Sequence, residues 1–249
     1  MDSYSSYLLR IGDNALILGQ RLAEICGHGP VLEEDIALTN ISLDLIGQSR
    51  MAYQRVAELE DCFKDEDDIA FMRDSHEYAN CLMVELENGD FGKTIARQFF
   101  FSAFQVPYLE VLTQSEDEFL RDFALKAVKE AKYHLKHSAQ WMVRLGDGTK
   151  ESHDRIQESV NLLWPFTGEI MIADELDEKA QAWGAPNLAD IKEIWSATVA
   201  KILEQATLTV TEPDVWMLRG GKQGNHTEHM GLILAEMQFL QRAYPGQEW

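Results

Sequence analysis

Residues 31–60 read VLEEDIALTNISLDLIGQSRMAYQRVAELE, and this stretch has the pattern of one long helix. One apolar stripe recurs at helical spacing and is formed by Leu38, Ile41, Leu45, Ala52, Val56 and Leu59. A second stripe lies on the other side and is formed by Ile36, Leu43, Ile46, Tyr53 and Ala57. Because a helix that is apolar on both flanks is usually buried on both, we expect residues 31–60 to lie centrally in a helical protein.

A polar strip lies between the two stripes and contains Asn40, Asp44, Gly47, Gln48, Met51 and Arg55. Polar groups held between buried flanks are costly unless they are hydrogen-bonded, ionically paired or bound to a metal. Asp44 is therefore a candidate buried acid. We expect it to pair with either His134 or Arg55, because an unpaired buried carboxylate would be costly or protonated.

Turn signals divide the rest of the chain into further helices. Only 6 prolines and 16 glycines punctuate the 249 residues, and β-branched alternation is scarce, which favours an all-α protein. The signals predict helices near 4–26, 31–60, 67–87, 92–113, 117–145, 150–163, 168–183, 188–208 and 225–243. Four consecutive long helices over 31–145 fit an antiparallel, ferritin-like four-helix bundle, with flanking helices over 4–26 and 150–243. No linker is long enough to separate domains, so the sequence predicts a single domain over 1–249.

The chain is strongly acidic, with 22 basic and 42 acidic residues and a net charge of −20 at pH 7. This charge repels nucleic-acid phosphates and anionic lipid headgroups, so we expect no nucleic acid and no membrane partner. A more basic protein is the expected partner. Cys26, Cys62 and Cys81 have no C-x-x-C spacing and are expected to be reduced, buried thiols. The amino terminus lacks a signal-peptide pattern and no apolar run is long enough to span a bilayer, which favours a cytoplasmic location.

A second stretch raises the question of a metal site. Residues 128–142 read VKEAKYHLKHSAQWM and place Glu130, His134 and His137 on one helical face. A di-iron centre in a four-helix bundle needs a Glu from each of two helices and a Glu-x-x-His pair from each of the other two. No glutamate in this sequence is followed three residues later by a histidine. The pattern required for di-iron binding is therefore incomplete.

At the positions that the di-iron pattern requires, the residues match it only in part. Asp44 stands in place of a glutamate in the first long helix, and in the second Glu77 is followed by Asn80. In the fourth, Glu130 is followed by Tyr133, while the third has no carboxylate before residue 110. We therefore predict no metal ligand and no catalytic residue in this chain, and a hydrogen-bonded polar core where a metal site would lie.

His226 and His229 form another candidate pair. Their spacing is compatible with zinc, but no third ligand is evident. We expect Asn225 and Glu228 to cap the helix over 225–243, and the two histidines to contact a neighbouring segment or a partner protein. The preceding GGKQG at 220–224 lacks the spacing of a phosphate-binding loop and is expected to connect helices.

Five longer runs are distinctive: GHGPVLEEDIALTNISLDLIGQSR, NGDFGKTIARQFFFSAFQ, KEAKYHLKHSAQWMVRLGDGTKESH, LWPFTGE and GGKQGNHTEHMGLILAEMQFLQRAYPG. Together they resemble the C-type, PaaC-like subunits of the bacterial ring-1,2-phenylacetyl-CoA epoxidase, a multicomponent monooxygenase of the ferritin-like family. The resemblance covers almost the whole chain.

The resemblance implies a role in aerobic phenylacetate degradation. It implies pairing with a related A-type subunit that carries di-iron and epoxidises the aromatic ring, together with a small B-type subunit. A reductase subunit with FAD and a 2Fe-2S cluster would supply electrons from NADPH. The resemblance also implies that catalytic relatives keep their ligands at the positions held here by Asp44, Glu77, Asn80, Glu130 and His134.

The sequence thus predicts a non-catalytic structural subunit of a phenylacetyl-CoA 1,2-epoxidase complex, with no cofactor of its own. One alternative is a carboxylate-bridged di-iron oxygenase with unusual ligands that acts in its own right. A second alternative is a metal-free binding module with an aromatic pocket lined by Phe99, Phe100, Phe101 and Phe104.

Overall fold

The computed structural model describes residues 1–247, and within them the regular structure is helical, with no strand. The all-α, ferritin-like helical class predicted from the sequence is confirmed. The chain divides into two compact units, the first comprising Met1–Glu87 and Arg219–Trp249 and the second comprising Asn88–Leu218. The predicted bundle core over 31–145 includes residues of both units. The single domain over 1–249 remains a prediction. Within the described residues, no helix combines the length and apolar character that a bilayer crossing requires.

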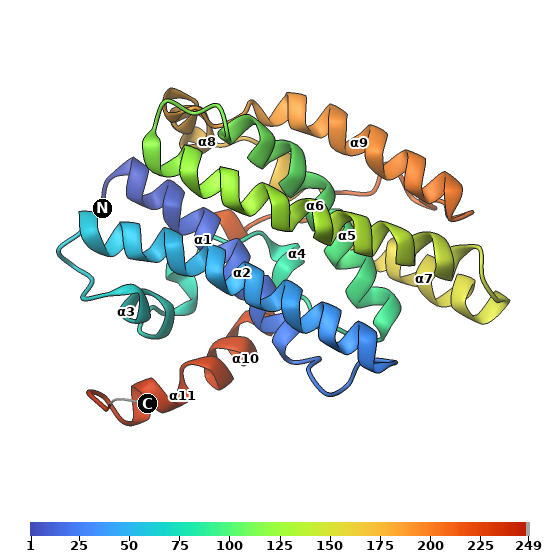
Figure 1. Cartoon of the computed structure of the whole chain (residues 1–249), viewed down its shortest axis with the longest axis horizontal. Coiled ribbons are helices and arrows are strands. Elements are labelled where there is room, and N and C mark those ends of the chain that lie inside the picture. The colour runs from blue at the N-terminus through green and yellow to red at the C-terminus, as the bar shows by residue number, and fades with distance from the viewer. Residues whose placement is uncertain (248–249) are drawn as a thin grey trace. The chain divides into compact units, whose positions relative to one another are not determined.

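The first unit is built on two long helices, α1 (Ser3–Ala23) and α2 (Leu32–Leu59), which lie side by side (Figure 1). Two glycines of α1, seven residues apart, allow the close approach. A Cβ added at Gly12 would lie 2.5 Å from Cε1 of Tyr53, and one added at Gly19 would lie 3.1 Å from Cγ1 of Ile46. Because residues seven apart share a helix face, α2 runs along one glycine-lined face of α1.

The boundaries of α2 match the prediction, but its burial does not. The first apolar stripe is buried except at its end, since Leu38, Ile41 and Leu45 are at most 1% exposed but Leu59 is 41% exposed. On the second stripe, Ile36 is 50% and Leu43 is 60% exposed. The prediction that both flanks of this helix are buried is wrong, because an apolar periodicity shows which faces can be buried and not whether a neighbour covers them.

The remaining elements of the first unit are short. They are α3 (Glu66–Phe71), η1 (Ser75–Glu77), α4 (Leu82–Glu85), η5 (Gly221–Gln223), α10 (Glu228–Met237) and α11 (Phe239–Ala243). The predicted helix over 67–87 is wrong, because the backbone is extended at Asp74, Tyr78 and Cys81. The predicted helix over 225–243 begins later and is divided at Gln238.

The second unit is centred on α5 (Phe91–Leu112), which packs against α6 (Glu118–Gly146), α7 (Lys150–Leu163) and α9 (Leu188–Gln205). These four match their predicted ranges within a few residues. The predicted helix over 168–183 is instead three short pieces, η3 (Glu169–Met171), α8 (Glu175–Ala180) and η4 (Gln181–Trp183), preceded by η2 (Trp164–Phe166).

Aromatic side chains fill the centre of the second unit. The Phe100 and Trp195 ring centroids are 6.0 Å apart, and those of Trp164 and Trp195 are 5.8 Å apart. The indole Nε1 of Trp195 donates to the Phe100 carbonyl at 3.0 Å, so the buried polar atom of this ring has a partner. The phenylalanines proposed as an alternative pocket lining, including Phe99 and Phe101, are at most 8% exposed and lie in this core.

Candidate functional site: buried polar networks of the first unit

The predicted ligand positions fall in both units. Asp44 on α2 is half-buried, Glu77 in η1 is exposed and Asn80 is completely buried. On α6 of the second unit, Glu130 is half-buried and His134 is completely buried, one helical turn apart. The predicted core therefore contains residues of very different exposure.

Glu77 has a local structural role. Its Oε2 accepts a hydrogen bond from the Asp74 backbone N–H at 2.7 Å and completes a capping box of η1. Because the backbone turns extended at Tyr78, Glu77 and Asn80 are not on one helical face, and the prediction that they share one is wrong. Asn80 instead donates from Nδ2 to Glu85 Oε2 at 2.9 Å.

A buried ion pair lies where the predicted helix is broken. Asp13 is completely buried, and its carboxylate accepts hydrogen bonds from Nη2 of Arg73 at 2.5 Å and from Nη1 at 3.2 Å. The Tyr53 hydroxyl donates to the same carboxylate at 2.5 Å, and the Ala79 backbone N–H donates at 2.8 Å. Arg73 also donates from Nε to the Ile69 carbonyl at 2.7 Å. These bonds tie α1, α2 and the segment after α3 together.

The two tyrosines of this network stay neutral. Burial raises the pKa of Tyr53 well above its usual range, and the nearby Asp13 charge raises it further. Burial likewise raises the pKa of Tyr78 to about 12, although the charge of Arg73 opposes the rise. The Arg73 guanidinium carbon lies 4.0 Å from the Tyr78 ring centroid, a cation–π contact. Both phenols therefore keep their protons, and Tyr53 donates to Asp13 while Tyr78 donates to the Ala70 carbonyl at 2.6 Å.

A second network surrounds Glu85, which is also completely buried. Its carboxylate accepts from Nδ1 of His226 at 2.7 Å, from the Thr227 backbone N–H at 2.6 Å and from Asn80. The other ring nitrogen of His226, Nε2, lies 3.0 Å from the Tyr78 carbonyl oxygen. Because both neighbours are acceptors, both ring nitrogens can donate only when the imidazole is protonated.

The pKa of His226 agrees with this geometry. Burial lowers it, but the hydrogen bond and charge of Glu85 outweigh burial, so the pKa is raised above its ordinary value. The sequence analysis expected His226 to contact either a neighbouring segment or a partner protein. The structure shows contacts with a neighbouring segment of this chain. His229 is half-buried in the first turn of α10.

Glycines bring the segment before α10 close to the Glu85 network. A Cβ added at Gly221 would lie 2.2 Å from the Asn80 carbonyl oxygen, and one at Gly224, where φ is +76°, would lie 2.2 Å from that of His76. The GGKQG stretch is thus a tightly packed connection. The predicted capping by Asn225 is wrong, because α10 begins at Glu228 and Thr227 caps it by accepting from the His229 N–H at 3.3 Å.

Almost the whole chain matches one protein family. Residues 2–249 match the family described as phenylacetic acid catabolic protein. The chain belongs to this family. It is 46% identical over 250 residues to the C subunit of 1,2-phenylacetyl-CoA epoxidase from Escherichia coli (strain K12), and the match covers 100% of both chains. The resemblance to C-type subunits inferred from the quoted runs is confirmed.

In this member of the phenylacetic acid catabolic protein family, Arg55 is too distant to be the hydrogen-bond partner of Asp44. The two residues lie on the continuous helix α2, and 11 residues at about 1.5 Å each separate them by about 16 Å. The Arg55 guanidinium pairs with Glu58 at 2.9 Å. This part of the predicted pairing is wrong, whereas pairing of Asp44 with His134 remains a prediction.

The residues at the predicted ligand positions do not fit a di-iron centre. Glu77 caps a surface turn, and the Asn80 amide is bonded to Glu85. Nowhere in residues 1–247 are three or more His, Cys, Asp or Glu side chains grouped so that they could hold a metal ion.

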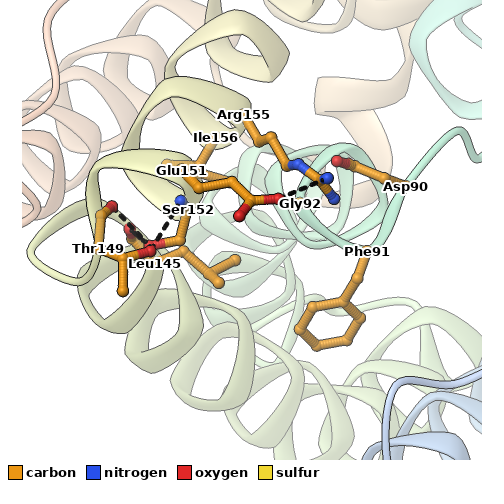
Figure 2. A pocket seen from close by; sticks show the side chains of 9 residues that line it. All are labelled: Asp90, Phe91, Gly92, Leu145, Thr149, Glu151, Ser152, Arg155 and Ile156. Atoms are coloured by element: carbon orange, nitrogen blue, oxygen red, sulfur yellow. Dashed lines mark hydrogen bonds and ion pairs between the residues drawn. The ribbon is translucent and has the colours of Figure 1, made fainter.

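A hollow of about 200 Å³ in the second unit contains none of the predicted site residues (Figure 2). It lies where α5 begins, α6 ends and α7 begins. Its polar groups bond to one another: Arg155 pairs with Glu151 at 2.7 Å, and the Ser152 hydroxyl donates to the Leu145 carbonyl at 2.8 Å. The ion pair lies within α7 and the Ser152 bond joins α6 to α7, which indicates a structural role.

Proposed function

We propose that this chain is the non-catalytic structural subunit of a phenylacetyl-CoA 1,2-epoxidase complex and stabilises a related di-iron catalytic subunit. Membership in the complex is supported by the full-length similarity to the C subunit from Escherichia coli. The reaction would belong to aerobic phenylacetate degradation in the cytoplasm.

The structural role is supported by the hydrogen bonds that the buried carboxylates of the first unit accept from other groups of the protein. Asp13 accepts four hydrogen bonds from protein donors, and Glu85 accepts three. An ionised carboxylate has about four lone-pair sites, so nearly all of this acceptor capacity is used inside the protein. Carboxylates bonded in this way hold segments together and are not available to a metal.

The proposed complex divides chemistry and support between its subunits. Di-iron in the catalytic subunit would supply oxygen activation, and a reductase subunit with FAD and a 2Fe-2S cluster would supply electrons from NADPH. A small B-type subunit would complete the assembly. This chain would hold no cofactor. Its rigid networks would provide a fixed surface against which the catalytic subunit packs, and the geometry of metal ligands depends on such supporting contacts.

The test is Asp44→Ala in the reconstituted complex, because Asp44 is the half-buried acid of the polar core predicted where a metal site would lie. A structural role predicts weaker assembly or a lower Tm, with turnover of phenylacetyl-CoA per assembled complex unchanged. Glu33→Ala, at an exposed position of the same helix, is the matched control. Normal assembly with a lost chemical step would contradict the proposal and favour the di-iron oxygenase alternative.

A further inference from the structure

The segment that follows α9, residues 209–218, contains no helix or strand and is nevertheless attached at both ends. At its start, the Thr209 N–H donates to Oε1 of Gln157 at 2.9 Å, and Nε2 of Gln157 donates to the Thr209 carbonyl at 2.7 Å. At its end, the Leu218 N–H donates to the Pro165 carbonyl at 2.8 Å. Hydrogen bonds to α7 and η2 therefore position the residues between.

One of the residues between these attachments is an exposed tryptophan. The Trp216 side chain is 75% exposed, more than any other large hydrophobic residue in the described part of the chain. Its neighbour Met217 packs against Gly168, where an added Cβ would lie 2.5 Å from Cγ of Met217. Tryptophan is among the residue types most enriched at the positions that dominate the binding energy of protein interfaces. A positioned, exposed indole is thus a candidate anchor.

Further exposed apolar residues lie on the same segment and on helix α7, to which the segment is bonded. Val215 and Leu162 line a hollow of about 210 Å³, together with Pro165. Leu162 is 54% exposed, and Leu218 is 41% exposed. We call Leu162, Val215, Trp216 and Leu218 the Trp216 surface. Single exposed apolar residues are ordinary, whereas several on one short segment and the helix that holds it are a candidate binding surface.

Three acidic residues lie at the hollow or next to it in the sequence, whereas Arg219 follows Leu218 at the other end of the segment. Glu158 and Glu212 line the hollow, Asp214 precedes Val215, and all three are exposed. Among the described residues that line the hollow, none is a lysine or an arginine. A second copy of this chain would bring its own net charge of −20, so like-charge repulsion disfavours self-association here. Charge complementarity favours a basic partner.

We propose that the Trp216 surface docks this chain into an apolar pocket, rimmed by lysine or arginine, on another subunit of the complex. This inference rests on the proposed function, because it assumes that such a complex forms. The indole would fill the pocket, and the three acids would pair with the basic rim.

The first experiment removes the anchor. Purified Trp216→Ala, Trp216→Phe and wild-type chains are titrated against the purified remaining subunits of the complex, and Kd is measured. Trp216→Ala is expected to bind at least about 10-fold more weakly, and Trp216→Phe to recover part of the loss. The matched control is Tyr133→Ala, since Tyr133 is a 47% exposed aromatic on α6 of the same unit. It is expected to change Kd less than about 2-fold.

The second experiment tests the charge of the rim. Glu212→Lys with Asp214→Lys is compared with Asp190→Lys with Glu193→Lys, which makes the same charge change at exposed positions of α9. The first double variant should weaken binding more than the second at low salt, and the difference should shrink as salt rises.

The outcomes separate the docking surface from the proposed function. If the wild-type chain binds, the docking surface alone is overturned when Trp216→Ala leaves Kd unchanged or when Tyr133→Ala raises Kd equally. A Trp216→Ala chain that changes only its self-association would also overturn it, in favour of contact between two copies. A wild-type chain that binds none of the other subunits would overturn the proposed function as well.

Discussion

Each unit contains a buried pair of residues that joins its segments, but the interactions differ. The pair is Asp13 with Arg73 in the first unit and Phe100 with Trp195 in the second. Each pair is buried and joins segments distant in the sequence, with separations of 60 and 95 residues. The first pair is an ion pair with further hydrogen bonds, whereas the second combines ring packing with one indole hydrogen bond.

The difference follows from the local structure around each pair. Phe100 lies within the 22-residue helix α5, whose backbone groups are paired inside the helix. Between α3 and α4 the backbone is largely extended and cannot satisfy its own polar groups. There Asp13 accepts from the Ala79 N–H and Arg73 donates to the Glu77 carbonyl, so the buried ion pair satisfies part of this backbone. In this part of the first unit, buried charge therefore accompanies irregular backbone.

The largest expected effect is that of Asp13→Asn. It leaves the buried Arg73 guanidinium without its counterion, and breaking a buried pair from one side costs about 3–5 kcal/mol. Urea unfolding of the variant measures this loss in the free energy of unfolding. Glu33→Gln, an exposed acid on α2, serves as the control and should change it by less than about 0.5 kcal/mol. A loss below about 1 kcal/mol for Asp13→Asn would show that the ion pair does not hold the first unit together.

Trp195→Phe should have a smaller effect in the second unit. It removes the hydrogen bond to the Phe100 carbonyl and part of the ring contact, at a cost of about 1–3 kcal/mol. The loss should be the same at low and high salt, since no charge is involved. Trp216→Phe is the matched control because that indole is 75% exposed. Equal losses in the two variants would contradict the aromatic account of this core.

The smallest expected effect is a dependence of stability on pH from His226. Its pKa is raised in the folded protein, so its stabilising contribution is complete below the unfolded pKa of about 6.5. That contribution is lost as pH rises through the folded value. His226→Gln should flatten the change in Tm over this interval, whereas His28→Gln, at an exposed position, should not. An unchanged pH profile in His226→Gln would mean that Glu85 does not hold this ring protonated.

The elements that the sequence predicted well are those whose own residues determine them. The range 150–163 was predicted for α7 and observed as Lys150–Leu163, because Thr149 caps its start and an apolar stripe continues to its end. The range 92–113 likewise agrees with Phe91–Leu112. Caps and periodicity are local signals, so one sequence suffices to read them.

The break within 67–87 could not be predicted in this way. Ile69, Met72 and Met83 recur at helical spacing, and the bonds that override this pattern come from residues far away, such as Asp13. A weak signal for the networks was nevertheless present. Asp13 lies in the apolar stripe of α1, and Glu85 interrupts the apolar run LMVEL at 82–86. A lone acid in an apolar run predicts a buried partner without naming it.

Iron content per chain tests the central claim most directly. The chain is expressed alone in iron-supplemented cells, purified without chelator and measured by elemental analysis. The structural account predicts iron far below one per chain, because the buried carboxylates of the first unit already accept protein donors. About two iron ions per chain, the content of a di-iron centre, would contradict that account. Asp44, Glu130 and His134 would then be the first ligands to test.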